Sequence, residues 1–217
     1  MSASEVRSAW QHATQHLDRP AADIWWHNLY HNYSRPERVY HNLTHLLDKY
    51  LLYRTVEAHI TNKTAVCLAL FFDYLEYDPK SMENSEKNIE RFKTFSSETG
   101  INTDSELYVD VIALLRCSGT HITEEHKAKD MYGTEDKHYF LDLDVAILGT
   151  EPDQYAEYAE KVKQEYHFLP PHLYNSLRLK VLQNFLQIPN IFATKVFRDK
   201  FEKQARLNIE IEIHSLQ

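Results

Sequence analysis

The chain has 217 residues, of which 43% are hydrophobic, 12% aromatic and 26% charged. This length and apolar content are enough for a sizeable core, so we expect a single domain over residues 1–217. The 24 basic and 32 acidic residues give a formal net charge of −8, which repels long nucleic acid. A small phosphorylated molecule remains a suitable partner, because a bound divalent cation can reverse the charge of an acidic pocket.

The cysteines and the N-terminus both favour a cytoplasmic protein. Cys67 and Cys117 each lie within an apolar stretch, which is typical of buried thiols in a reducing compartment. The first ten residues include Glu5 and Arg7 and lack the apolar core of a signal peptide. The longest apolar run, residues 65–72, is far shorter than the roughly 20 residues that a membrane span requires. We therefore expect a core helix there and no membrane association.

The predicted elements are helices throughout. Four glycines are too few for a protein rich in hairpins, so we predict an all-α fold with short loops. Residues 121–138 are charged and lack an apolar period, which indicates a long loop or a lid over a pocket. The alternating residues 207–213 could form a strand, but we expect a helix end. Apolar spacing predicts helices over residues 22–33, 41–53, 63–77, 84–97, 103–117, 141–148, 152–167, 173–186 and 191–211.

Some polar residues occur where a purely structural role is harder to explain. His41 and His45 lie four apart in a predicted helix, so both should project from one face. Half-buried histidines bonded to carbonyls are the commoner outcome of such spacing. Asp73 follows an apolar run, where an unpaired carboxylate is costly, so we expect a metal or an arginine beside it. Asp142 is expected to cap the N-terminus of its helix, which leaves Asp144 pointing elsewhere.

Three segments together resemble one family. Residues 33–46 read YSRPERVYHNLTHL, residues 77–79 read YDP and residues 141–149 read LDLDVAILG. They are similar to motifs of a group of HD-superfamily metal-dependent phosphohydrolases, and the likeness extends through most of the chain. The resemblance implies an HD-domain-like helical bundle in which a metal-bound water attacks a phosphoryl group.

The resemblance also implies roles for individual residues. It makes His41, Asp73 and Asp144 the ligands of one divalent metal, and we expect these side chains to converge. Two further groups follow from the same motifs: His121 and Glu76 as catalytic residues, and His45, Asp78 and Arg178 as substrate-binding residues.

The chain departs from the family at the doublet that names the superfamily. In a gapless alignment, His-Asp becomes Asp73 and Tyr74, and a phenol with a pKa of about 10 is a poor ligand at neutral pH. A shift by one residue instead gives Phe72 and Asp73 for His-Asp, and Glu76, three residues beyond Asp73, then falls where some HD enzymes keep a catalytic acid. This shift loses the register of residues 77–79, so we prefer the gapless alignment. Because a carboxylate replaces the imidazole, any bound metal should be weakly held, with Mg²⁺ or Mn²⁺ favoured over Zn²⁺, Fe²⁺ or Ni²⁺.

The sequence leaves three functions open. The first is a metal-dependent phosphohydrolase of small phosphate esters or nucleotides. The second is a pseudoenzyme that keeps the fold as a ligand-binding or interaction module. The third is a helical scaffold in which every histidine is structural. All three are compatible with a homo-oligomer.

Overall fold

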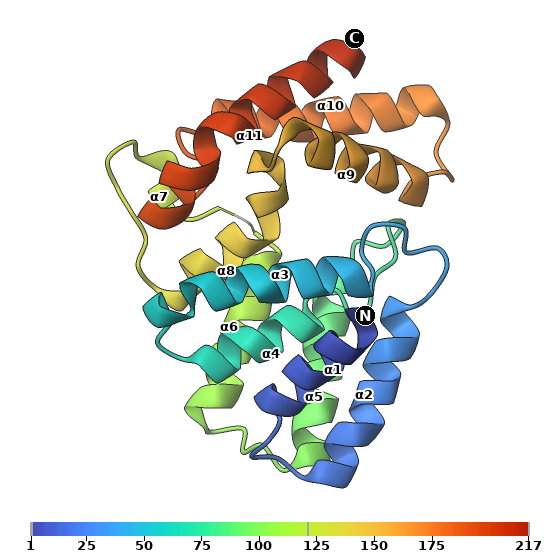
Figure 1. The fold of residues 1–217 in the computed structure, drawn as a ribbon, viewed down its shortest axis with the longest axis vertical. Helices are drawn as coiled ribbons and strands as arrows, with labels where there is room; N and C mark the ends of the chain where they lie inside the picture. Colours follow the sequence, from blue (N-terminus) through green and yellow to red (C-terminus); the bar gives the residue numbers. More distant parts are fainter. Residues whose placement is uncertain (1, 121, 217) are drawn as a thin grey trace. The chain divides into compact units, whose positions relative to one another are not determined.

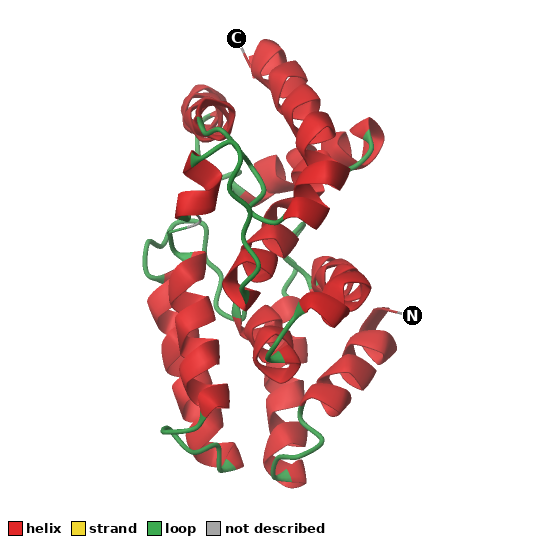
Figure 2. Cartoon of the chain, turned by 90° about the vertical axis from the view of Figure 1, so that its left-hand side faces the viewer, coloured by secondary structure: helices red, strands yellow, loops and turns green. Residues whose placement is uncertain are grey.

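The computed structural model describes residues 2–120 and 122–216 (Figure 1). Within these ranges the chain consists of helices and loops without a strand (Figure 2), which confirms the all-α prediction. No helix of the described residues is both long and apolar enough to cross a membrane. Backbone contacts divide the chain into two compact units, Met1–His121 (unit 1) and Ile122–Gln217 (unit 2). The expectation of a single domain stays a prediction.

Unit 1 is built around α4, in which residues 65–72 are all buried. Helices α1, α3, α5 and α6 all contact α4, so the prediction of a central apolar helix is confirmed. Trp10 of α1 lies edge-on to Phe71 of α4, with 5.2 Å between the ring centroids. The elements of unit 1 are α1 (Ser2–Ala13), α2 (Arg19–Tyr33), α3 (Leu43–Val56), η1 (Glu57–His59), α4 (Lys63–Phe72), α5 (Asn84–Thr99) and α6 (Glu106–Ser118).

Helix α4 ends earlier than the sequence predicts, because two buried side chains hold the following residues in a turn. Arg38 donates hydrogen bonds to the carbonyls of Tyr74 and Leu75, at 2.6 and 2.7 Å. Asn88 of α5 donates to the carbonyl of Asp73 at 2.7 Å. These donors replace helical hydrogen bonds, so the turn that carries Asp73 and Tyr74 is fixed against α5.

Unit 2 contains two long helices, α10 and α11, which contact each other. The helix predicted from residue 191 begins only at Lys195, because residues 188–194 form bends and a single isolated bridge from Thr194 to Gly133, whereas the alternating apolar residues 207–213 are helical, as expected. Gly149 packs so closely on α11 that a Cβ there would lie 2.6 Å from the carbonyl oxygen of Phe201. The elements of unit 2 are α7 (Glu124–Lys127), α8 (Asp136–Val145), η2 (Ala146–Gly149), α9 (Pro152–Glu165), α10 (Pro171–Gln187) and α11 (Lys195–Leu216).

Asp142 supports the start of α11 and not the start of its own helix. Because α8 begins at Asp136, Asp142 is internal to it, and the expected N-terminal cap is wrong. Its buried carboxylate accepts hydrogen bonds from the Ala193 and Thr194 amides at 2.7 and 2.8 Å, and from the Thr194 hydroxyl at 2.6 Å. Burial raises the pKa of Asp142 to about 7, although these three hydrogen bonds oppose the rise. The carboxylate thus satisfies backbone donors that precede α11.

Candidate functional site

Asp73 forms a buried ion pair at the C-terminal end of α4. The Lys49 Nζ of α3 lies 3.1 Å from Asp73 Oδ2, and the two side chains are only 4% and 3% exposed. The Ser118 hydroxyl, at the end of α6, donates to Asp73 Oδ1 at 2.6 Å. The partner is therefore a lysine, where the sequence predicted a metal or an arginine.

A cluster of aromatic rings lies beside this ion pair. The His41 ring stacks on Tyr74 with 4.6 Å between centroids, and its centroid is 4.3 Å from that of Tyr77. The buried His45 ring lies 4.4 Å from the ring of Tyr40. We call these five residues the ring cluster. All but His45 are partly exposed.

The two histidines are close, but not for the reason that their spacing suggested. Helix α3 begins at Leu43, and the side chain of Asn42 accepts hydrogen bonds from the Thr44 and His45 amides as the N-terminal cap. His41 therefore precedes the helix, and the prediction that both histidines share one helix face is wrong. Their ring centroids are nevertheless 5.5 Å apart, because the chain turns back at the cap.

The described residues do not fit a divalent metal at Asp73. A metal needs several donor atoms at about 2 Å, whereas the two Asp73 oxygens face Lys49 and Ser118. Across residues 2–120 and 122–216, no group of three or more His, Cys, Asp or Glu side chains is arranged to hold an ion. The Lys49 ammonium supplies a positive charge at the carboxylate instead.

Two other predicted site residues of unit 1 have local partners. The Glu76 carboxylate lies 2.9 Å from Arg91 Nε of α5, in a half-exposed ion pair. The exposed Asp78 accepts a hydrogen bond from the Lys80 amide at 2.9 Å, which is the geometry of a local turn. The structure gives each carboxylate a structural contact, and their catalytic and substrate-binding roles stay predictions.

The remaining predicted residues do not belong to the described part of unit 1. Arg178 of α10 donates from Nε and Nη2 to the two carboxylate oxygens of Glu212 in α11, at 2.8 and 3.0 Å. Asp144 is partly exposed on α8. His121 lies outside the described residues. The convergence of Asp144 with His41 and Asp73 therefore stays a prediction.

Comparisons with protein-family models, with curated proteins and with solved structures find no match to this chain. The resemblance to the HD superfamily rests on the motif residues alone. Any activity that it implies is a proposal.

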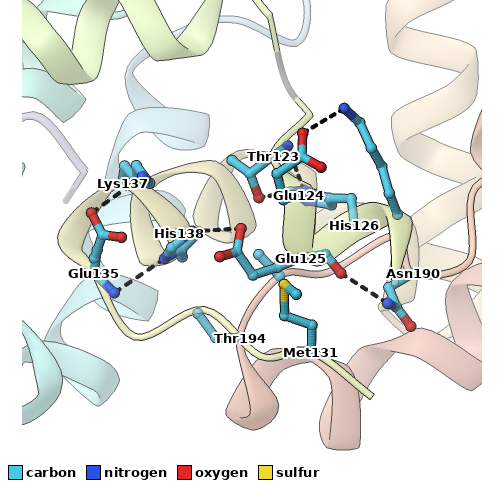
Figure 3. A network of polar contacts seen from close by, with 12 residues as sticks. Thr123, Glu124, Glu125, His126, Met131, Glu135, Lys137, His138, Asn190 and Thr194 are labelled. Atoms are coloured by element: carbon cyan, nitrogen blue, oxygen red, sulfur yellow. Dashed lines mark hydrogen bonds and ion pairs between the residues drawn. The ribbon is translucent and has the colours of Figure 1, made fainter. Parts of the chain in front are cut away.

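The charged segment expected to be a long loop is anchored within unit 2. Its residues 122–138 contain α7, and their backbone bonds to the residues before α11. Asn190 donates from its side chain to the carbonyls of Glu125 and Ala128, at 2.9 and 2.8 Å (Figure 3). The Gly133 amide donates to the Ala193 carbonyl at 2.9 Å. The segment is thus largely a loop, as predicted, with the four-residue helix α7 in it and local hydrogen bonds that hold it in place, and its role as a lid over a pocket stays a prediction.

Two buried histidines organise this segment (Figure 3). His138 accepts the Glu135 amide at Nδ1 at 3.1 Å, while its Nε2 lies 2.9 Å from a Glu125 carboxylate oxygen. The ring proton of the neutral form is thus on Nε2 and faces Glu125. His126 accepts the Thr123 amide at Nδ1 at 2.9 Å. Each ring caps a short helix through an unprotonated nitrogen.

Two pKa values in this segment are strongly lowered. Burial, with His138 next in importance, lowers the pKa of His126 to about 4. A hydrogen bond from Thr123, assisted by His138, lowers the pKa of Glu125 to about 2. At neutral pH the segment therefore holds an ionised Glu125 beside a neutral His126.

Sequence reasoning missed Lys49, although its position carries a signal. On α3 the buried apolar residues Leu46, Tyr53 and Val56 mark the inward face. Lys49 lies three residues after Leu46 and four before Tyr53, so it falls on that same face. A buried lysine is costly unless an acidic side chain compensates its charge. Asp73, at the C-terminal end of α4, is such a side chain.

Proposed function

We propose that the chain is a catalytically inactive relative of HD-type phosphohydrolases, which keeps its helical scaffold to bind a small phosphorylated molecule. The buried pair of Lys49 and Asp73 is the observation that carries this proposal. It favours the pseudoenzyme over the phosphohydrolase among the functions that the sequence left open.

The chemistry of lysine explains why this pair argues against hydrolysis. A divalent metal acidifies its bound water and polarises a phosphoryl oxygen. The Lys49 ammonium cannot coordinate a water or a phosphoryl oxygen as a metal ion does. Its positive charge is also already compensated by the Asp73 carboxylate. A metal at Asp73 would have to displace Lys49 and leave a buried ammonium beside a dication. That arrangement costs several kcal/mol.

The ring cluster supports binding of a ligand that contains a planar ring. Tyr40, His41, Tyr74 and Tyr77 are partly exposed, and the rings of the three tyrosines all contact the ring of His41. Aromatic side chains stack on nucleobases with a typical gain of about 1–3 kcal/mol per base. The imidazole of His41 can in addition donate a ring N–H hydrogen bond to a phosphate oxygen. A nucleoside monophosphate combines both features.

Titration with AMP, followed by calorimetry and by phosphate release, tests the proposal. We expect saturable binding, with no phosphate released in the presence of Mg²⁺ or Mn²⁺. Tyr77→Ala should weaken binding about tenfold by removing one stacking surface. Tyr30→Ala is the matched control, because Tyr30 is an exposed tyrosine of α2 whose ring contacts Trp26. Metal-dependent turnover, or no binding at all, would contradict the proposal.

A further inference from the structure

Unit 2 contains a pocket between α9 and α11 with a volume of about 290 Å³. Small-molecule sites typically occupy roughly 300–1,000 Å³, so this pocket suits a compact ligand. Its walls are mainly apolar. They include Tyr155, Ala156 and Ala159 of α9 and Ile211 and Leu216 of α11.

One residue of the lining carries a buried hydroxyl for which the described part of the chain supplies no hydrogen-bond partner. Tyr174 of α10 lines the pocket and is only 5% exposed. Among the described residues, its hydroxyl finds no hydrogen-bond partner. The neighbouring Tyr155 hydroxyl, by contrast, donates to Glu212 at 2.5 Å. Burial raises the pKa of Tyr174 to about 12, so the hydroxyl is a protonated donor that lacks an acceptor. Such a buried group normally indicates a missing water or ligand.

The charges around the pocket cancel. The lining residue Glu212 is bound through both carboxylate oxygens by Arg178. The other charged lining residues, Glu160 and Lys163, have opposite signs and are exposed at the rim. An ionic ligand would therefore lose hydration without gaining a net countercharge.

We propose that this pocket is a binding site for a small, uncharged, mostly apolar molecule whose single acceptor oxygen receives the Tyr174 hydroxyl. The walls would bury the apolar body of the ligand, and the hydroxyl would select molecules that carry a carbonyl or an ether oxygen. This proposal does not rest on the function proposed for unit 1, because all of the residues that carry it belong to α9, α10 and α11.

Two probes of similar shape separate the hydrogen bond from apolar burial: acetophenone has a carbonyl, and ethylbenzene does not. We expect both to shift amide resonances of α9 and α11 in NMR titrations of the full chain. Acetophenone should bind about three- to tenfold more tightly, which is the range for one neutral hydrogen bond. Tyr174→Phe should abolish this preference while leaving ethylbenzene binding unchanged.

Two variants control the test. Tyr158→Phe removes a hydroxyl that accepts from Arg178 at 3.3 Å but is not part of the lining, so the preference should persist. Ala159→Trp should fill the pocket and prevent binding of both probes, and circular dichroism checks that each variant is folded. The proposal is overturned if neither probe shifts α9 and α11 resonances, or if Tyr174→Phe keeps the preference. An ordered water on Tyr174 that remains in a crystal soaked with acetophenone would also overturn it.

Discussion

Lys49 and Asp73 lie 24 positions apart in the sequence, yet their charged atoms meet 3.1 Å apart in the interior of unit 1. Neither charge has access to bulk water, because the two side chains are 4% and 3% exposed. The Asp73 carboxylate therefore depends on the Lys49 ammonium for its burial. This dependence predicts how single and paired substitutions change the free energy of unfolding.

Lys49→Met should lower the free energy of unfolding by about 3–5 kcal/mol, because it leaves the Asp73 carboxylate buried without a countercharge. Asp73→Leu should also be destabilising, because it removes the carboxylate that pairs with the Lys49 ammonium. The double variant Lys49→Met/Asp73→Leu should regain most of the loss, since no buried charge remains. Urea unfolding of the four proteins measures this cycle.

An exposed pair provides the control for that cycle. Lys195 and Asp199 form an ion pair on the surface, where their side chains are 65% and 60% exposed. Lys195→Met should therefore change stability by less than about 1 kcal/mol. Losses that simply add in the Lys49 and Asp73 double variant would show that the two charges do not depend on each other.

Restoring the family's doublet should not by itself create a metal site. In Asp73→His/Tyr74→Asp, the Lys49 ammonium remains available to the new carboxylate, since it lies 5.0 Å from the present Tyr74 ring centroid. We expect this double variant to stay metal-free, and the triple variant with Lys49→Met to bind a transition metal. Metal analysis after incubation with Zn²⁺ and Mn²⁺ compares them. Stoichiometric metal in the double variant would show that Lys49 does not block the site.

The contribution of His126 to the stability of unit 2 should fall as the pH drops from about 6.5 to about 4, whereas Asp142, whose pKa is raised to about 7, contributes with the opposite sign in this window. The pKa of His126 is lowered from 6.5 to about 4 in the folded chain, so the unfolded chain binds the additional proton in this window. The resulting decrease in the contribution of His126 to the free energy of unfolding is at most about 3 kcal/mol. The pKa of Glu125 is lowered from 4.5 to about 2. Its contribution to the free energy of unfolding should therefore also fall with the pH, between about pH 4.5 and 2.

Unfolding measured between pH 4 and 7 tests the role of His126. His126→Gln removes the titrating ring, so the free energy of unfolding of the variant should rise relative to that of the wild type as the pH drops from about 6.5 to about 4. His214→Gln, at an exposed histidine of α11, should leave the dependence unchanged. An unaltered slope in His126→Gln would assign the pH dependence to other groups.

The close approach of η2 to α11 makes Gly149 sensitive to a single methyl group. A Cβ at Gly149 would lie 2.5 Å from Phe201 Cβ and 2.6 Å from its carbonyl oxygen, so Gly149→Ala must displace backbone. We expect a loss of about 3 kcal/mol. The nearest atom to a Cβ at Gly119 is at 3.5 Å, and Gly119→Ala should cost less than about 1 kcal/mol. Equal melting temperatures for the two variants would contradict the packing described.

The helical pattern of the chain could be predicted because apolar spacing reports directly on helices such as α4. Helix α1 was not predicted, although Val6, Ala9, Trp10 and Ala13 are buried at helical spacing. The end of α4 could not be predicted, since it depends on distant donors from Arg38 and Asn88.

The candidate site was only partly accessible from the sequence. Motif resemblance singled out His41, His45 and Asp73, and their side chains do lie in or beside one cluster of unit 1. The partner of Asp73 was missed, because pairing of α3 with α4 is a tertiary relationship that no local pattern contains. Lys49 shows the general difficulty: a lysine reads as a surface residue until the carboxylate that neutralises it is known.

The metal content of the purified wild-type chain tests the central claim most directly. The protein should be expressed in medium supplemented with Mn²⁺, Fe²⁺ and Zn²⁺, purified without chelators and analysed by mass spectrometry of its metals. Because the Lys49 ammonium neutralises Asp73, the account predicts far less than one metal ion per chain. One tightly bound transition-metal ion per chain, lost in Asp73→Ala, would contradict it.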